Sequence, residues 1–396
     1  MLTHRWFTLL IASGISVTGS SLAFAQKPID VVKPITSPTR VSLSAKPLLA
    51  QTFTKADLSE EDQEKLDDLL RQGQDRVDAQ DYDGAIDFYQ QAIRLDPENA
   101  RLYSGIGYLY TQQERYADAI EPYQQALSLE PENIPFHYGL AYAYVQLENY
   151  PSAASLYESI LIIAPDEADA YLGLGNIYTL QKDYISALAT YEDFTRTAPN
   201  NAQAYEALGT LYLNQADFIA ARDAFQRALS INRQRSAPYV GLAEAQLALD
   251  NPEGAFRSLE EAVKLDPSAA RAHFLLGELA IEQGDEDAAY TYYRRAVEAN
   301  PSLLAAQAVV GAMHLEREAY VQAVLAYRQV TRMLPDNAGA HYNLGLALWG
   351  QGLQQQAVDA VLRARRLYEQ QDDLASTERV TALLDLWGIA PEANQN

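Results

Sequence analysis

Apolar side chains recur three or four residues apart through most of the chain, in stretches of roughly a dozen residues divided by short polar turns. This spacing predicts amphipathic helices that bury one face each. Proline punctuates the pattern at intervals of 34 residues or twice that, at Pro97, Pro131, Pro165, Pro199, Pro267, Pro301 and Pro335. A fixed period of this length indicates one helical hairpin stacked many times.

Small side chains keep the same register as the prolines. When proline is the thirty-second place of a unit, the eighth place is always Gly or Ala and the twentieth is always Ala. We expect these two places to face each other where the two helices cross, with the usually aromatic twenty-fourth place filling the space beside them. The nine units begin at Leu66, Ala100, Ile134, Ala168, Ala202, Ser236, Ala270, Leu304 and Ala338.

This order of small, aromatic and proline positions resembles the tetratricopeptide repeat (TPR) family. The resemblance covers about residues 66–371. It implies an all-α fold, a right-handed α-solenoid of nine TPR helix-turn-helix units within residues 57–371. Residues 372–387 are predicted to form a C-terminal capping helix that covers the last repeat with Val380, Leu383, Leu384 and Trp387, and residues 388–396 to form a frayed tail.

The first 56 residues have a different composition. Residues 1–25 combine a positive start with an apolar run and end in Ala23-Phe24-Ala25, a pattern typical of a cleaved signal peptide, with an uncleaved anchor as the alternative. Residues 26–56, with four prolines, are predicted to be a disordered linker. The expected location is therefore extracytoplasmic, in the periplasm, the thylakoid lumen or the medium, without an integral membrane span after cleavage.

Charge and residue types narrow the function. A formal net charge of −23 argues against nucleic acid as a partner. The absence of cysteine excludes disulfides, thiolate metal sites and cysteine nucleophiles. Three histidines, His137, His273 and His341, occupy the fourth place of a unit, where packing is expected, and no phosphate loop or nucleophile motif is found. We therefore expect a non-enzyme without a resident cofactor.

The resemblance also implies where a partner binds, because five places of the first helix face the concave groove in this family. Here the predicted groove combines aromatic and amide side chains, and Tyr108, Tyr138, Tyr142 and Phe274 are expected to stack on an extended peptide. The predicted partner-binding residues are Tyr108, Tyr138, Tyr142, Gln146, Leu172, Asn176, Glu206, Thr210, Asn214 and Phe274.

Four further groove positions are acidic: Glu244, Glu278, Glu282 and Glu316. If neighbouring helices bring these carboxylates together, they form one patch that attracts a basic peptide or holds a hard divalent ion such as Mn²⁺ or Ca²⁺. A solvated acidic face without a ligand is the simpler alternative.

Together these features favour an exported TPR scaffold or adaptor that binds protein or peptide, including soluble segments of membrane-protein complexes. The architecture resembles the periplasmic TPR factors of cyanobacteria that assist photosystem II assembly, so assembly of an envelope or photosynthetic complex is the expected setting. Two alternatives remain open: an acidic chaperone for divalent metal ions, and a structural component of a secretion or export machine.

Overall fold

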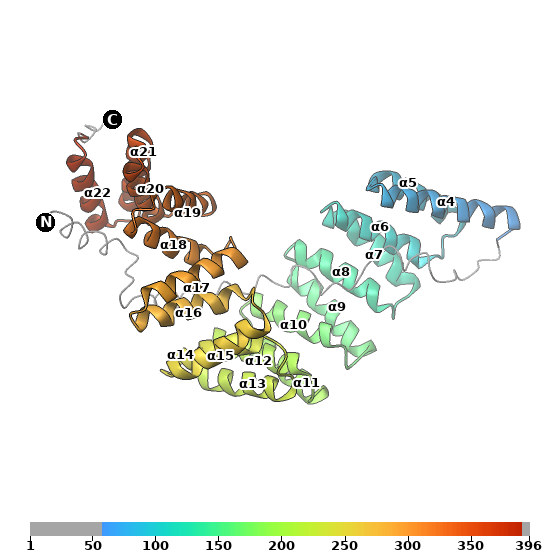
Figure 1. Ribbon diagram of the computed structural model, residues 1–396. Helices are drawn as coiled ribbons and strands as arrows, with labels where there is room; N and C mark the ends of the chain where they lie inside the picture. Colours follow the sequence, from blue (N-terminus) through green and yellow to red (C-terminus); the bar gives the residue numbers. More distant parts are fainter. Residues whose placement is uncertain (1–57, 390–396) are drawn as a thin grey trace. The chain divides into compact units, whose positions relative to one another are not determined.

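A computed structural model describes residues 58–389, and within them every regular element is an α-helix. Consecutive helices pack as hairpins, which confirms the all-α fold of about nine TPR units followed by a further helix (Figure 1). The signal peptide predicted for residues 1–25, the linker predicted for residues 26–56 and most of the predicted tail lie outside the described residues. No helix within the described part is both long and apolar enough to span a bilayer.

The described residues form two compact units that meet in sequence between Ile231 and Asn232. In the first unit, each pair of helices forms one hairpin and each second helix also packs against the first helix of the following pair. Its helices are α4 (Glu60–Asp78), α5 (Tyr82–Leu95), α6 (Ala100–Gln112), α7 (Tyr116–Leu129), α8 (Ile134–Gln146), α9 (Tyr150–Ile163), α10 (Ala168–Leu180), α11 (Tyr184–Thr197), α12 (Ala202–Asn214) and α13 (Phe218–Ile231).

The second unit repeats the same hairpin and adds a single last helix. Its helices are α14 (Ala237–Ala248), α15 (Pro252–Leu265), α16 (Ala270–Glu282), α17 (Glu286–Ala299), α18 (Leu304–Glu316), α19 (Tyr320–Met333), α20 (Ala338–Gly350), α21 (Gln354–Gln370) and α22 (Leu374–Leu386). The last helix packs against α21 and buries Val380 and Leu384, while the rings of Trp349 and Trp387 stack at 4.0 Å between centroids.

The turn inside each hairpin has a fixed chemistry. The residue between the C-cap of the first helix and the residue that precedes the second helix adopts a left-handed conformation, as at Glu148 (φ 56°) and Gly284 (φ 76°). The next residue is often an aspartate or asparagine whose side chain accepts a hydrogen bond from a backbone N–H of the second helix, as Asp183 does from Ser186 at 3.1 Å. This cap satisfies a donor that the helix leaves unpaired. The second helices α7, α19 and α21 begin at the same place of the repeat without a side-chain cap.

The helix crossings differ in one respect from the sequence prediction. The eighth-place glycine is held mainly by the twenty-fourth-place ring rather than by the twentieth-place alanine. A Cβ added to Gly107 would lie 2.8 Å from the ring of Tyr123, and one added to Gly139 of the next hairpin would also meet that ring. The Tyr123 ring, only 1% exposed, is therefore clamped between two glycines and couples successive hairpins.

Gly277→Ala tests this clamp, because the added methyl group would lie 2.6 Å from the Tyr293 ring. We expect the free energy of unfolding to fall by about 1–3 kcal/mol, since overpacking a buried site displaces side chains and backbone. Urea denaturation followed by circular dichroism measures the change.

The matched control is Gly339→Ala in α20, where the nearest neighbouring atoms lie 3.6 Å from the added Cβ. Removing a flexible glycine from a helix is expected to leave stability unchanged or to raise it by up to about 1 kcal/mol. Equal losses for the two variants would show that the close ring contact is not what requires glycine at position 277.

Burial of the core tyrosines predicts alkaline unfolding. Burial raises the pKa of Tyr89 and of Tyr157 from 10.0 to about 12. Between these values the unfolded chain loses its phenolic protons before the folded chain does, so stability present below pH 10 is lost as the pH rises toward 12. Melting curves read by circular dichroism, together with tyrosinate absorbance, should show ionisation and unfolding in one transition. Ionisation of all tyrosines near pH 10 in a folded chain would contradict this.

Candidate protein-binding surface

Two of the predicted groove tyrosines recur at the same place of adjacent hairpins. Tyr108 on α6 and Tyr142 on α8 both stand at the ninth place of their repeats, and both side chains are half-buried. The two helices are in contact, so these positions belong to one surface of the first unit. A half-buried tyrosine keeps one part of its ring and its hydroxyl available to a ligand.

Each of these tyrosines meets another tyrosine from the start of the preceding second helix. Tyr116, the first residue of α7, meets Tyr142 edge to face, with 5.9 Å between ring centroids and 83° between planes. Burial first and hydrogen bonding to Tyr142 second raise the pKa of Tyr116 to about 12. Tyr82, the first residue of α5, and Tyr108 pack against the same apolar cluster, and burial first and the charge of ionised Tyr82 second raise the pKa of Tyr108. We call Tyr82, Tyr108, Tyr116 and Tyr142 the tyrosine ladder.

The sequence prediction missed Tyr82 and Tyr116 because it considered only first helices. Both residues stand at the seventeenth place of a repeat, and this place continues as a half-buried aromatic column through the first unit. The 34-residue recurrence of this column was a signal available in the sequence. Its members are Tyr82, Tyr116, Tyr150, Tyr184 and Phe218.

Several other predicted groove residues serve the core of the first unit. Tyr138 is 6% exposed, and its hydroxyl donates a hydrogen bond to Glu167 at 3.2 Å. The Oδ1 atom of Asn176 accepts a hydrogen bond from the core residue Tyr191 at 3.0 Å. Leu172 is half-buried against two apolar clusters to which α11 and α12 contribute. Little of the Tyr138 surface therefore remains for a ligand.

The remaining predicted residues of this unit lie along helix α12 and at helix ends. Thr210 donates its hydroxyl hydrogen bond to the Glu206 carbonyl oxygen at 2.9 Å, within α12. Gln146 and Asn214 are the last residues of α8 and α12. All four side chains are half-buried, so they border the surface without forming an aromatic pair of their own.

In the second unit, Arg271 contacts two of the predicted residues, Phe274 and Glu244. Phe274 is 9% exposed and its ring lies 5.6 Å from the Tyr293 ring centroid. The guanidinium of Arg271 lies 5.6 Å from the Phe274 centroid, and its Nε donates to Glu244 at 2.7 Å. Glu244 is thus engaged by a cation within the chain.

The other three predicted glutamates lie on α16 and α18. Glu278 accepts the hydrogen bond of the Tyr293 hydroxyl, while Glu282 and Glu316 are exposed at the ends of their helices. Local exclusion of water and repulsion from Glu286 raise the pKa of Glu316. Among residues 58–389, no three histidine or acidic side chains are grouped to hold a metal ion, and the Mn²⁺ or Ca²⁺ site stays a prediction.

Solved structures similar to this chain are tandem-repeat proteins. A tetratricopeptide repeat protein from Parabacteroides merdae is 19% identical, with a TM-score of 0.49, over 63% of this chain and 98% of that one. The PilF protein of Pseudomonas aeruginosa is 21% identical, with a TM-score of 0.43, over 54% and 96%. YrrB, described as a TPR protein with an unusual peptide-binding site, is 20% identical, with a TM-score of 0.36, over 46% and 95%. A comparison with curated proteins found no match.

Family models account for most of the repeats. Models described as tetratricopeptide repeat match residues 70–134, 110–166, 147–211, 202–235 and 240–303. A model described as TPR repeat matches residues 311–352. These matches span both compact units and together cover more than half of the chain.

Tyr142→Phe tests the pairing within the tyrosine ladder. Loss of the hydroxyl should lower the pKa of Tyr116 from about 12 toward 10, and burial should hold it above 10. NMR of ring-labelled tyrosine, recorded as the pH rises through the range in which circular dichroism shows a folded chain, measures the onset of Tyr116 ionisation, with Tyr110→Phe as the control that leaves Tyr116 unchanged. An unchanged Tyr116 in the Tyr142→Phe variant would contradict the contact.

Proposed function

Because the chain belongs to the tetratricopeptide repeat family, we propose that this scaffold for protein–protein interaction binds an extended segment of a partner across the tyrosine ladder. The observation that carries the proposal is the aromatic pair of Tyr116 with Tyr142, together with Tyr82 and Tyr108, which stand at the same places of the preceding hairpins and pack against one apolar cluster. Core packing alone is already provided by the buried twenty-fourth-place rings, such as Tyr123. The half-buried pairs add aromatic surface that a ligand can cover.

The spacing of the pairs suggests the form of the ligand. The helices that carry Tyr108 and Tyr142 are in contact, and packed helix axes lie about 8–10 Å apart. An extended chain advances about 3.3 Å per residue, so side chains about three residues apart would reach successive pairs. The expected segment therefore carries two apolar or aromatic side chains at that spacing, with its backbone polar groups near the tyrosine hydroxyls.

The net charge of the chain also favours some partner segments over others. The net charge of −23 disfavours acidic segments at long range and speeds the approach of basic ones. We therefore expect the bound segment to carry lysine or arginine beside its apolar side chains. This preference weakens as salt screens the charges.

The cellular setting is part of the same proposal. The signal-like pattern of residues 1–25 supports export. An exported scaffold would meet soluble segments of envelope or photosynthetic membrane complexes and hold them during assembly. Fractionation of cells that produce the full-length chain, with detection of a shortened mature form outside the cytoplasm, tests export independently of binding.

Peptide selection tests the docking surface directly. Peptides selected from a displayed random library on the purified protein should lose about thirtyfold in affinity for the double variant Tyr116→Ala/Tyr142→Ala, because aromatic anchors dominate such interfaces. Fluorescence anisotropy measures affinity, and circular dichroism verifies that the variant is folded.

Tyr205→Ala is the control, because Tyr205 is also half-buried and lies in the same unit but outside the ladder. Its removal should leave the selected peptides bound. Selected peptides that bind the ladder variant and the native protein equally would refute docking at this surface.

A further inference from the structure

One exposed face of α19 combines aliphatic and basic side chains. Val321, Leu325, Arg328 and Arg332 follow one another four, three and four residues apart, so they share one side of the helix. Val321 is 51% exposed, Leu325 is 64% exposed, and both arginines are exposed. The opposite side of α19 buries Ala323, Val324, Ala326, Tyr327 and Val330. We call the four exposed residues the α19 stripe.

The α19 stripe departs from the pattern of the other repeats. The residues equivalent to Leu325 in the other eight hairpins are Asp87, Glu121, Ser155, Ala189, Asp223, Arg257, Thr291 and Asp359. Leu325 is the one large apolar side chain in this series. Folding of the hairpin therefore does not require a leucine there, and Leu325 adds to Val321 a second exposed aliphatic side chain on the same side of α19.

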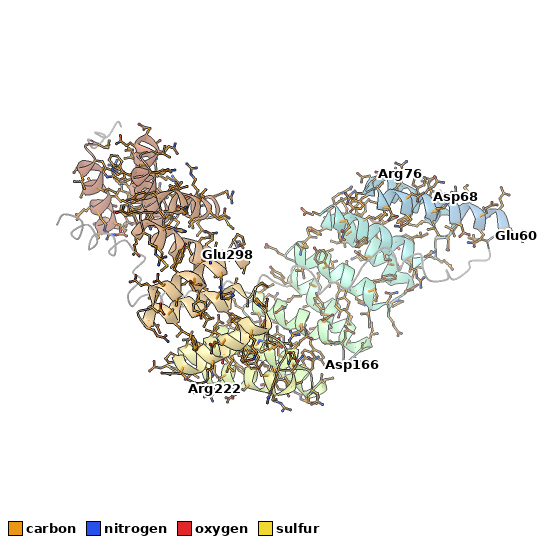
Figure 2. The ribbon with its side chains drawn as sticks, viewed as in Figure 1. Glu60, Asp68, Arg76, Asp166, Arg222 and Glu298 are labelled. Carbon is orange, nitrogen blue, oxygen red and sulfur yellow. The ribbon has the colours of Figure 1, made fainter. Side chains whose placement is uncertain are left out.

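The arginines of the stripe form hydrogen bonds to glutamine side chains. Arg328 donates to the Oε1 atom of Gln356 at 2.9 Å, and Arg332 donates to Gln329. Within the described residues, neither arginine has a carboxylate at ion-pair distance. Arg294, at the place of α17 equivalent to Arg328, does have one, at 3.5 Å from Glu298, which is labelled in Figure 2.

We propose that the α19 stripe is a second docking surface, which binds an acidic amphipathic helix of a partner protein. The four, three, four spacing matches the side-chain rows that interlock when two helices pack. The aliphatic half would be covered by apolar side chains, and the two guanidinium groups would pair with carboxylates of the partner. The site is separate from the tyrosine ladder and lies in the other compact unit.

The same side chains are less suited to an anionic membrane. Membrane-surface binding relies on many basic residues spread over one face, because each contributes little by itself. Because the net charge of the chain is −23, attraction of anionic groups is confined to short range at the two arginines, which stand at one end of the stripe with two aliphatic residues at the other. This arrangement fits a partner helix that carries acidic residues at one end and apolar residues at the other.

The experiment uses the full chain and a synthetic helical peptide. Along the peptide, two glutamates precede two leucines in an alanine-rich background. A peptide helix antiparallel to α19 then places its glutamates beside the arginines and its leucines beside Val321 and Leu325. We expect binding, measured by fluorescence anisotropy, that weakens at least about tenfold in Arg328→Glu/Arg332→Glu and in Val321→Ser/Leu325→Ser. Arg328→Gln/Arg332→Gln should give a smaller loss, and added salt should weaken binding to the native chain.

Controls separate the stripe from the ladder and from lipid. A peptide with lysine in place of glutamate should not bind, and Tyr116→Ala/Tyr142→Ala should bind the acidic peptide as the native chain does. No binding of the acidic peptide, or equal binding by the charge-reversed variant with an unchanged melting curve, would overturn the proposal. Binding to phosphatidylglycerol vesicles without binding to the acidic peptide would overturn it in favour of a membrane contact.

Discussion

The close contact between a small residue of the first helix and a large side chain of the second, most often a glycine and an aromatic ring, sets the geometry of this protein. The ring of Tyr123 fills the space between Gly107 of its own hairpin and Gly139 of the next, where any side chain would collide with it. The close approach fixes how the two helices of a hairpin cross and how the following hairpin stacks on them. Because the crossing residues are buried and recur at fixed places of the repeat, exposed positions can change without disturbing the stack.

Because the buried crossing residues hold the stack, the exposed residues differ along the chain. In the first unit, the start of a second helix lies beside the ninth place of the next first helix, so tyrosines at both places form the ladder. Where the ninth place is Asn176 or Glu278, the side chain accepts a hydrogen bond from a core tyrosine instead. On α19, the residues of the α19 stripe are exposed and do not contribute to the buried core of the hairpin.

The 34-residue period was sufficient to predict the helices, their pairing and the positions of the small crossing residues. It did not predict which groove side chains are buried, because burial depends on contacts with other helices. Tyr138 packs against Tyr157 and donates a hydrogen bond to Glu167, and Phe274 packs against Tyr293. It also did not predict Tyr116 as a site residue. That assignment depends on the contact between successive hairpins, which follows from three-dimensional stacking rather than from the pattern within one hairpin.

Hydrogen exchange with a selected peptide bound is the most direct test of the central claim, that the stacked crossings create a tyrosine surface for a partner. The account predicts slower amide exchange confined to the segments around Tyr82, Tyr108, Tyr116 and Tyr142. Protection located only in α14–α22, or no protection by a peptide that binds tightly, would contradict it.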